Sequence, residues 1–148
     1  MLRQYLVGAA ASVCNIAIHA FVMVIVIKAA RIADELATRY QTLRLIAVMS
    51  AAVMVLMIAH LAEVLVWSLI YVIFGVAPDG SDIVYFAFVN YTTLGYGDVT
   101  PVVRWHLLGP MTAMNGVLLF GWSTAVIFEV LRMTLLANND IGTETRPR

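Results

Sequence analysis

The sequence has 148 residues, of which 62% are hydrophobic and only 12% are charged. Soluble domains carry about 25% charged residues, so this composition indicates a protein that lies in a membrane. The formal net charge is zero, which gives no reason to expect a nucleic-acid partner. Within these residues the single cysteine, Cys14, allows no disulfide and no thiolate metal cluster, and we interpret it as a small packing residue.

The first apolar segment runs from Tyr5 to Ile27 and exceeds the roughly 20 residues that a membrane-spanning helix needs. Arg3 in front of it leaves a signal peptide as an alternative, but the segment is long for one and no clear cleavage site follows. Ser12, Asn15 and His19 recur at helical spacing on one face. Because a polar stripe in a membrane helix usually faces protein, we expect a retained helix that packs against other helices.

A linker rich in basic residues follows, from Lys28 to Arg44. It carries four basic residues and two acidic ones: Lys28, Arg31, Arg39, Arg44, Asp34 and Glu35. The positive-inside rule therefore places the linker in the cytoplasm and the amino terminus outside. Its apolar residues recur every three to four positions: Ile32, Leu36, Tyr40 and Leu43. They allow an amphipathic helix at the inner membrane surface, and a solvated extension of either flanking helix is the alternative.

Leu45 to Phe74 is the second long apolar segment, and a helix of this length should tilt in the membrane. It carries a polar and aromatic face with spacings of three and four residues: His60, Glu63, Trp67 and Tyr71. His60 could be a hydrogen-bonded residue between helices, a proton sensor or a metal ligand. We favour the hydrogen-bonded role, since one histidine and one glutamate make a poor metal site.

Pro78, Asp79 and Gly80 predict a turn, after which Ser81 or Asp82 caps a short helix. This helix is expected from Ile83 to Tyr91, and its aromatic residues give it bulk: Tyr85, Phe86, Phe88 and Tyr91. The carboxyl end of a helix carries partial negative charge, which favours a nearby cation.

The segment Thr92-Thr93-Leu94-Gly95-Tyr96-Gly97-Asp98 follows this helix directly. Two glycines separated by one aromatic residue can take up φ values that other residues avoid, so successive carbonyls can point the same way. Such carbonyls replace the hydration shell of a cation, but one strand offers only a single column of them. Several copies of the chain must then face each other around an axis, and we expect a homo-oligomer.

This segment resembles the selectivity filter of potassium channels, usually written Thr-Val-Gly-Tyr-Gly-Asp, with Leu94 in place of the valine. The resemblance implies that K⁺ is bound by the Thr93 hydroxyl and by the carbonyl oxygens of Thr93, Leu94, Gly95 and Tyr96. Gly97 and Asp98 would then close the outer mouth. The residues that would support the filter are Thr92, Asp98, Tyr85 and Val89. Val89 stands where relatives sometimes have a glutamate bonded to the outer aspartate, so Asp98 needs another partner, Tyr85 or Trp105.

His106 to Leu136 is expected to be the inner helix. Alignment with small two-helix bacterial potassium channels puts Gly116 at the position of the gating hinge. The same resemblance implies a cavity lined by Val117, Phe120, Thr124 and Phe128, which fall within roughly 80° on a helical wheel. Glu129 falls on the opposite side, where it should pair with Arg132 or Arg44.

A buried polar cluster is expected from Asn15, His60, Glu63 and Asn115. Counted from the outer ends of their helices, Asn15, Glu63 and Asn115 lie near one depth, and Asn115 is turned away from the pore toward the helix that carries Glu63. We therefore predict a hydrogen bond between Glu63 and Asn115, with Glu63 either protonated or paired with His60. Such a cluster could only hold helices together, or it could limit how far the inner helix bends at Gly116.

The expected fold is an all-α membrane protein with three transmembrane helices, a re-entrant pore helix and a selectivity filter. Residues 1–44 would form the first helix and the linker, residues 45–137 the pore domain, and residues 138–148 a disordered tail. The expected function is passive K⁺ conduction by a homotetramer in the cell membrane, with the carboxyl terminus cytoplasmic. The lipid bilayer is then the surrounding partner and K⁺ the permeant ligand, and we expect neither a cofactor nor enzymatic activity. A subunit of a potassium uptake transporter and a non-conducting regulatory subunit are the alternatives.

Overall fold

The computed structural model describes the backbone of residues 1–35 and 41–144 and the side chains of residues 1–33 and 41–136. The described elements are all helical: α1 (Leu2–Glu35), α2 (Gln41–Phe74), α3 (Ile83–Tyr91), the short 3₁₀ helix η1 (Val103–Trp105) and α4 (Leu108–Glu144). Three stretches are long and apolar enough to cross a membrane: Leu2–Ala33, Gln41–Phe74 and Val103–Leu136. The chain is thus an all-α protein with three membrane-spanning helices.

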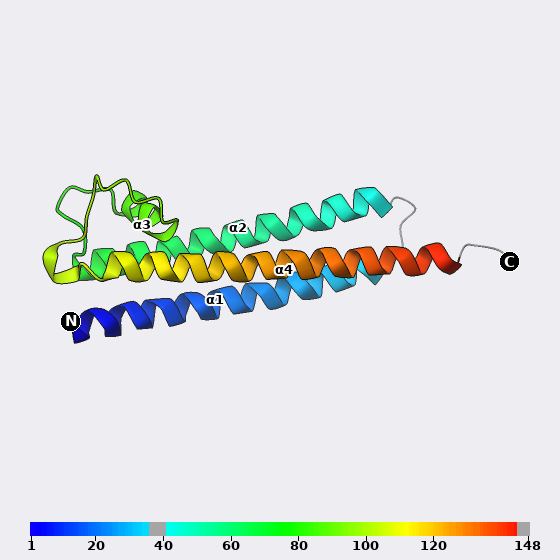
Figure 1. Cartoon of the computed structure of the whole chain (residues 1–148), viewed down its shortest axis with the longest axis horizontal. Helices are drawn as coiled ribbons and strands as arrows, with labels where there is room; N and C mark the ends of the chain where they lie inside the picture. The colour runs from blue at the N-terminus through cyan, green and yellow to red at the C-terminus, as the bar shows by residue number, and fades with distance from the viewer. Residues whose placement is uncertain (36–40, 145–148) are drawn as a thin grey trace.

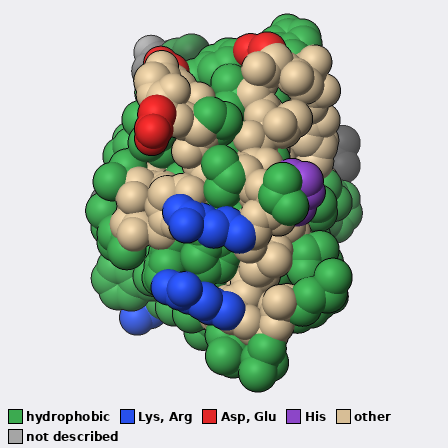
Figure 2. Space-filling view, turned by 90° about the vertical axis from the view of Figure 1, so that its left-hand side faces the viewer, with side chains coloured by type: hydrophobic (Ala, Val, Ile, Leu, Met, Phe, Trp, Pro, Cys, Tyr) green, Lys and Arg blue, Asp and Glu red, His purple; other side chains and the backbone are tan. Residues whose placement is uncertain are grey.

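The three long helices lie side by side along the longest axis, and α3 lies beside α2 at one end of the bundle (Figure 1). The amino terminus, the end of α2, the loops around α3 and the start of α4 all lie at this end. The chain therefore enters the bundle with α3 and returns to the same end, as the predicted re-entrant segment requires. Figure 2 views this end face, where acidic and basic side chains are both exposed.

The core at this end is aromatic and joins all four α-helices. Its largest buried side chains come from α2, α3 and η1: Trp67, Tyr71, Phe86, Tyr91 and Trp105. On α1, Gly8 allows a close approach to α4, because a Cβ there would run into the side chains of Met111 and Leu108. The Gln4 side chain also accepts a hydrogen bond from the Leu107 N–H at 2.9 Å. These contacts fix α1 to the start of α4.

All three long helices extend beyond the bounds that the apolar pattern predicts, and α2 begins at Gln41 instead of Leu45. α1 continues past Ile27 to Glu35, so for residues 28–35 the observed structure is the predicted alternative, an extension of the flanking helix. This stretch is rich in alanine and has no glycine or proline to end a helix. Leu36 and Tyr40 of the expected amphipathic linker lie outside the described residues. α4 continues to Glu144, so residues 138–144, expected to be disordered, are helical, and residues 145–148 lie outside the described residues.

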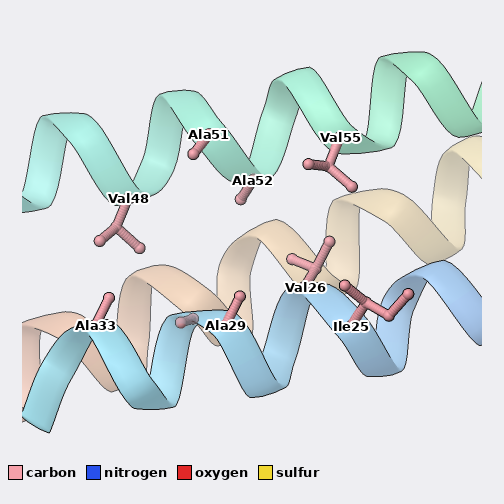
Figure 3. Close-up of a pocket in the computed structure, with 9 residues that line it drawn as sticks. Ile25, Val26, Ala29, Ala33, Val48, Ala51, Ala52 and Val55 are labelled. Carbon is pink, nitrogen blue, oxygen red and sulfur yellow. The ribbon is translucent and has the colours of Figure 1, made fainter.

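At the other end of the bundle, α1 and α2 leave an apolar groove of about 130 Å³ between them (Figure 3). Alanine side chains face each other across it, which leaves space that larger residues would fill. The lining residues are Ile25, Val26, Ala29, Ala30, Ala33, Val48, Ala51, Ala52 and Val55. None of these side chains carries a polar group that could orient a ligand, so the groove lacks the polar contacts of a specific binding site.

Candidate functional site

The helix α3 begins and ends where the sequence predicts. Asp82 is the N-cap residue, and its side chain accepts a hydrogen bond from the Tyr85 N–H at 3.0 Å. The turn before it is closed by a bond from the Ser81 N–H to the Pro78 carbonyl at 3.2 Å, with Gly80 at a φ of 81°. At the other end the Thr92 N–H donates to the Phe88 carbonyl at 2.9 Å. The next segment, residues 92–98, therefore begins directly at the carboxyl end of this short helix.

The backbone after α3 alternates in the sign of φ. Thr93, Gly95 and Gly97 have φ values of 61°, 58° and 79°, whereas the residues between them keep negative φ. In a regular strand successive carbonyls point to opposite sides, and alternating signs of φ allow them to point to one side. Thr93 is β-branched, and such a residue at positive φ is a strained outlier that costs about 1–3 kcal/mol. The segment therefore has the conformation that its glycine spacing predicts.

The carboxyl end of α3 holds the first residues of this segment. The Val89 carbonyl accepts hydrogen bonds from the N–H groups of Leu94 at 3.0 Å and Gly95 at 3.4 Å. The Thr92 hydroxyl donates to the Phe88 carbonyl at 2.8 Å, and the Thr93 hydroxyl donates to the Thr92 carbonyl at 2.6 Å. Among the described residues, no hydrogen bond is accepted by the carbonyls of residues 93–96. These oxygens remain available as ligands.

At the other end of the segment, Asp98 is held by Tyr85. The Tyr85 hydroxyl donates to Asp98 Oδ2 at 2.8 Å, and Asp98 Oδ1 accepts from the Val99 N–H at 3.1 Å. This hydrogen bond to the carboxylate raises the pKa of Tyr85 above its ordinary value. Of the two partners predicted for Asp98, Tyr85 is the one observed. Trp105 is buried, and its ring lies under the Arg3 guanidinium at 5.2 Å.

The predicted polar residues meet in the interior of the bundle, but with different partners. Asn115 Oδ1 accepts from Trp67 Nε1 at 3.0 Å and from Asn15 Nδ2 at 3.1 Å. Asn15 Nδ2 also lies 3.2 Å from the backbone carbonyl of Glu63. Asn115 thus faces α2 as predicted, but the predicted bond between the Glu63 and Asn115 side chains is wrong. Instead, the indole N–H of Trp67, about one helical turn from Glu63, donates to the Asn115 oxygen.

The Glu63 carboxylate is fully buried and bonded on three sides. Its Oε1 lies 2.6 Å from His19 Nδ1, and its Oε2 lies 3.0 Å from His60 Nδ1 and accepts a hydrogen bond from the Tyr91 hydroxyl. The predicted pairing with His60 is confirmed. His19 was not assigned to the cluster from the sequence, although its place one turn after Asn15 on the polar stripe of α1 was the available signal.

Both histidine rings also reach the same residue of α4. Ser123 Oγ lies 2.9 Å from His60 Nε2 and 3.2 Å from His19 Nε2. His19, His60, Glu63, Tyr91 and Ser123 form a connected set that we call the histidine–glutamate cluster. This cluster joins α1, α2, α3 and α4. Its member on α3, Tyr91, immediately precedes Thr92.

The α4 residues predicted to line a cavity share an exposed side of the helix in the single chain: Val117, Phe120, Thr124 and Phe128. Glu129 pairs with Arg132, whose Nη2 lies 2.8 Å from its Oε1, as one of the two predicted options. A Cβ on Gly116 would overlap the carbonyl oxygen of Tyr91, so a glycine is needed there for the close approach of α4 to α3. The hinge role of Gly116 stays a prediction.

A protein-family model described as ion channel matches residues 59–133, about half of the chain. The match includes the carboxyl-terminal half of α2, all of α3, the segment of alternating φ and most of the spanning part of α4. Comparisons with curated proteins and with solved structures found no match.

Proposed function

The chain belongs to the ion channel family whose model covers residues 59–133, and we propose that it conducts K⁺ passively through a pore formed by four copies. This function is transport down a gradient, and it calls for no chemical step on the permeant ion.

One observation carries the proposal: the alternating φ of residues 93–97 together with the unoccupied carbonyls of residues 93–96. A column of oxygens on one side of a strand can replace the water around a dehydrated cation. The Thr93 hydroxyl adds one more oxygen at the inner end of that column. The carboxyl end of α3 adjoins it and contributes partial negative charge. Together these features favour a monovalent cation, and the resemblance of the segment to potassium filters supports K⁺ as that cation.

Uncovered apolar side chains support assembly with further copies. Leu94 and Tyr96, in the filter itself, are 53% and 69% exposed in the single chain. Val117 and Phe128 on α4 are likewise 55% and 66% exposed. One column of carbonyls cannot surround an ion, so the pore must lie on a rotation axis. A fourfold axis through the filter would cover the exposed filter side chains and give the ion oxygens from every side.

The distribution of basic residues supports an orientation with the filter outside. Lys28 and Arg31 lie in the last turns of α1, and Arg44 lies in the first turn of α2, at the end of the bundle opposite to α3 (Figure 1). Because cytoplasmic ends of spanning helices are enriched in lysine and arginine, we infer that this end faces the cytoplasm. The amino terminus is then outside, as the filter is, and the end of α4 is cytoplasmic in a cell membrane.

The test measures K⁺ flux into liposomes that contain only this protein. A second measurement with Na⁺ in the external solution provides the comparison. The matched control is Gly95→Ala. A Cβ at this position has space, with the nearest atom 3.8 Å away, but the φ of 58° is one that alanine avoids, so the variant disturbs the backbone conformation and not the packing. We expect K⁺ flux from the wild type and none from the variant, with the same helical circular dichroism. An intact tetramer without flux would refute the proposal and favour the non-conducting subunit.

A further inference from the structure

The histidine–glutamate cluster contains three metal-ligating groups whose donor atoms all lie within 4.8 Å of one another: His19, His60 and Glu63. They come from two spanning helices, α1 and α2, and they lie at a distance in sequence from the predicted filter. His19 and Glu63 are fully buried, whereas the His60 side chain is 16% exposed. We propose that these three residues bind a divalent transition-metal ion such as Zn²⁺ inside the bundle. The proposal does not depend on K⁺ conduction.

The donor set fits this class of ion. Two imidazole nitrogens and one carboxylate are a common set of protein ligands for Zn²⁺, with a fourth position left for another oxygen. Tyr91 supplies that oxygen, since its hydroxyl lies 2.9 Å from His60 Nδ1 and is bonded to Glu63. Metal binding would displace the phenol proton to the solvent, and the carboxylate and the phenolate together would then match the two charges of the ion. Mg²⁺ and Ca²⁺ prefer oxygen-only sites, so the two nitrogens disfavour them.

The surroundings of the rings fit metal binding through Nδ1. A histidine that binds a metal by one ring nitrogen donates the N–H of the other to a nearby acceptor. Here both Nε2 atoms face Ser123 Oγ, at 2.9 Å and 3.2 Å, and a hydroxyl oxygen has two lone pairs to accept both. One residue on α4 therefore orients both ligands.

The same count fails when Glu63 is ionised, both imidazoles are neutral and no metal is bound. If both Nδ1–H groups donate to Glu63, both Nε2 atoms become acceptors. Ser123 has a single hydroxyl hydrogen to offer them, so one buried nitrogen is left without a donor. A metal ion removes this shortfall. One additional proton, on Glu63 or on an imidazole, would remove it too. The experiment must therefore distinguish a bound metal from a bound proton.

The cluster has an access side and a route to the filter. The partly exposed ring of His60 packs against Phe120, with ring centroids 4.7 Å apart, on the side of α4 predicted to face the cavity. Tyr91 is the last residue of α3 and immediately precedes Thr92. A bound ion would thus tie α1 and α2 to the helix that holds the filter. We expect Zn²⁺ to change K⁺ flux as a consequence of binding.

The primary experiment titrates the purified, tag-free full chain with Zn²⁺ and with Co²⁺, whose visible absorption reports tetrahedral coordination. We expect one ion per chain, a higher thermal midpoint with Zn²⁺ than with EDTA, and a nitrogen and oxygen shell with imidazole by X-ray absorption. His19→Asn and Glu63→Gln keep hydrogen-bonding groups in place but are poor ligands. Each should weaken binding by about tenfold or more.

His106 provides the matched control, since it is the chain's third histidine and is exposed on the surface. His106→Asn should leave Zn²⁺ affinity unchanged. Binding that survives in both cluster variants, or that disappears in His106→Asn, would overturn the proposal. So would a wild-type protein that shows no Zn²⁺-dependent thermal shift, a result that would leave a proton as the occupant. If the variants do not fold, the X-ray absorption spectrum of the Zn²⁺-loaded wild type decides alone: imidazole ligands support the site, and their absence overturns it.

Discussion

Gly116 and Gly121 offer a comparison that tests the packing of α4 against α3. A Cβ on Gly116 would overlap the Tyr91 carbonyl oxygen and lie 3.0 Å from the Tyr91 carbonyl carbon. Both are backbone atoms, so no flexible side chain can move aside. A Cβ on Gly121 meets nothing within 4 Å in the single chain. We therefore expect Gly116→Ala and Gly121→Ala to have opposite effects on stability.

The magnitudes follow from two terms. Replacing glycine by alanine inside a helix gains about 1 kcal/mol of helix stability, and both variants share this gain. Forcing an additional methyl group into a packed site costs about 1–3 kcal/mol, and only Gly116→Ala bears this cost. The difference between the two variants thus isolates the packing term, at about 1–3 kcal/mol for each chain.

The assay is reversible unfolding of the assembled protein in detergent, followed by circular dichroism, with K⁺ flux measured on the same preparations. Gly121→Ala should unfold later than the wild type, and Gly116→Ala should unfold earlier and lose flux, because Tyr91 adjoins the proposed filter. Equal stability of the two variants would refute the close approach. If Gly116→Ala changed flux with unchanged stability, the hinge role predicted for Gly116 would be the better explanation.

Three further predictions concern the interior, the voltage response and the outer mouth. A double-mutant cycle of Trp67→Phe and Asn115→Ala should show a coupling of about 0.6 kcal/mol in the free energy of unfolding. The effects of Glu63→Gln and Asn115→Ala on that free energy should be additive. The reverse result would contradict the observed hydrogen bonds. Conductance should depend only weakly on voltage. A charge that crosses the membrane field gains about 2.3 kcal/mol per 100 mV, but no spanning helix carries a row of basic residues that could move in the field. A steep conductance–voltage curve with several gating charges would contradict this. Tyr85 has a raised pKa because its hydroxyl donates to Asp98. The protonated phenol makes this bond, so the support for the outer mouth is complete below the ordinary pKa of about 10 and is lost as the pH rises through the raised value. An ultraviolet difference titration of wild type against Tyr85→Phe checks this, and an apparent pKa at or below about 10 would disagree with the structure.

Local chemistry made the conformation around the proposed filter, residues 93–97, predictable. Asp82 caps α3, and the glycines at 95 and 97 allow the positive φ that the structure shows. These features depend on residues close together in the sequence, so they could be derived without knowing how the helices pack. The positive φ of Thr93 could not be derived in this way, because a β-branched residue resists it and only the surrounding bonds impose it.

The polar cluster was predictable only in part, because it depends on packing between distant helices. The depth argument placed Asn15, Glu63 and Asn115 together correctly. It could not determine which atoms meet, since that depends on the rotation of each helix and the length of each side chain. Asn115 meets the indole of Trp67, and the Glu63 carboxylate turns to His19 instead.

The ends of the long helices were the least predictable part of the fold. The continuous apolar run of α1 stops at Ile27, but the helix continues to Glu35 because the alanine and charged residues that follow favour helix. The sequence allowed this extension only as one of two alternatives for the linker. Hydropathy reports where a segment can lie in lipid, and helix propensity decides where the backbone stops. The two criteria therefore give different ends for the same helix.

The most direct test of the central claim is the reversal potential of single channels in a planar bilayer with K⁺ on one side and Na⁺ on the other. The purified chain alone should produce currents that reverse far toward the K⁺ equilibrium potential, because the carbonyls of residues 93–96 would replace the hydration shell of K⁺. Currents that reverse near zero, with comparable permeability to Na⁺ and K⁺, would contradict the assignment of residues 93–97 as a potassium filter.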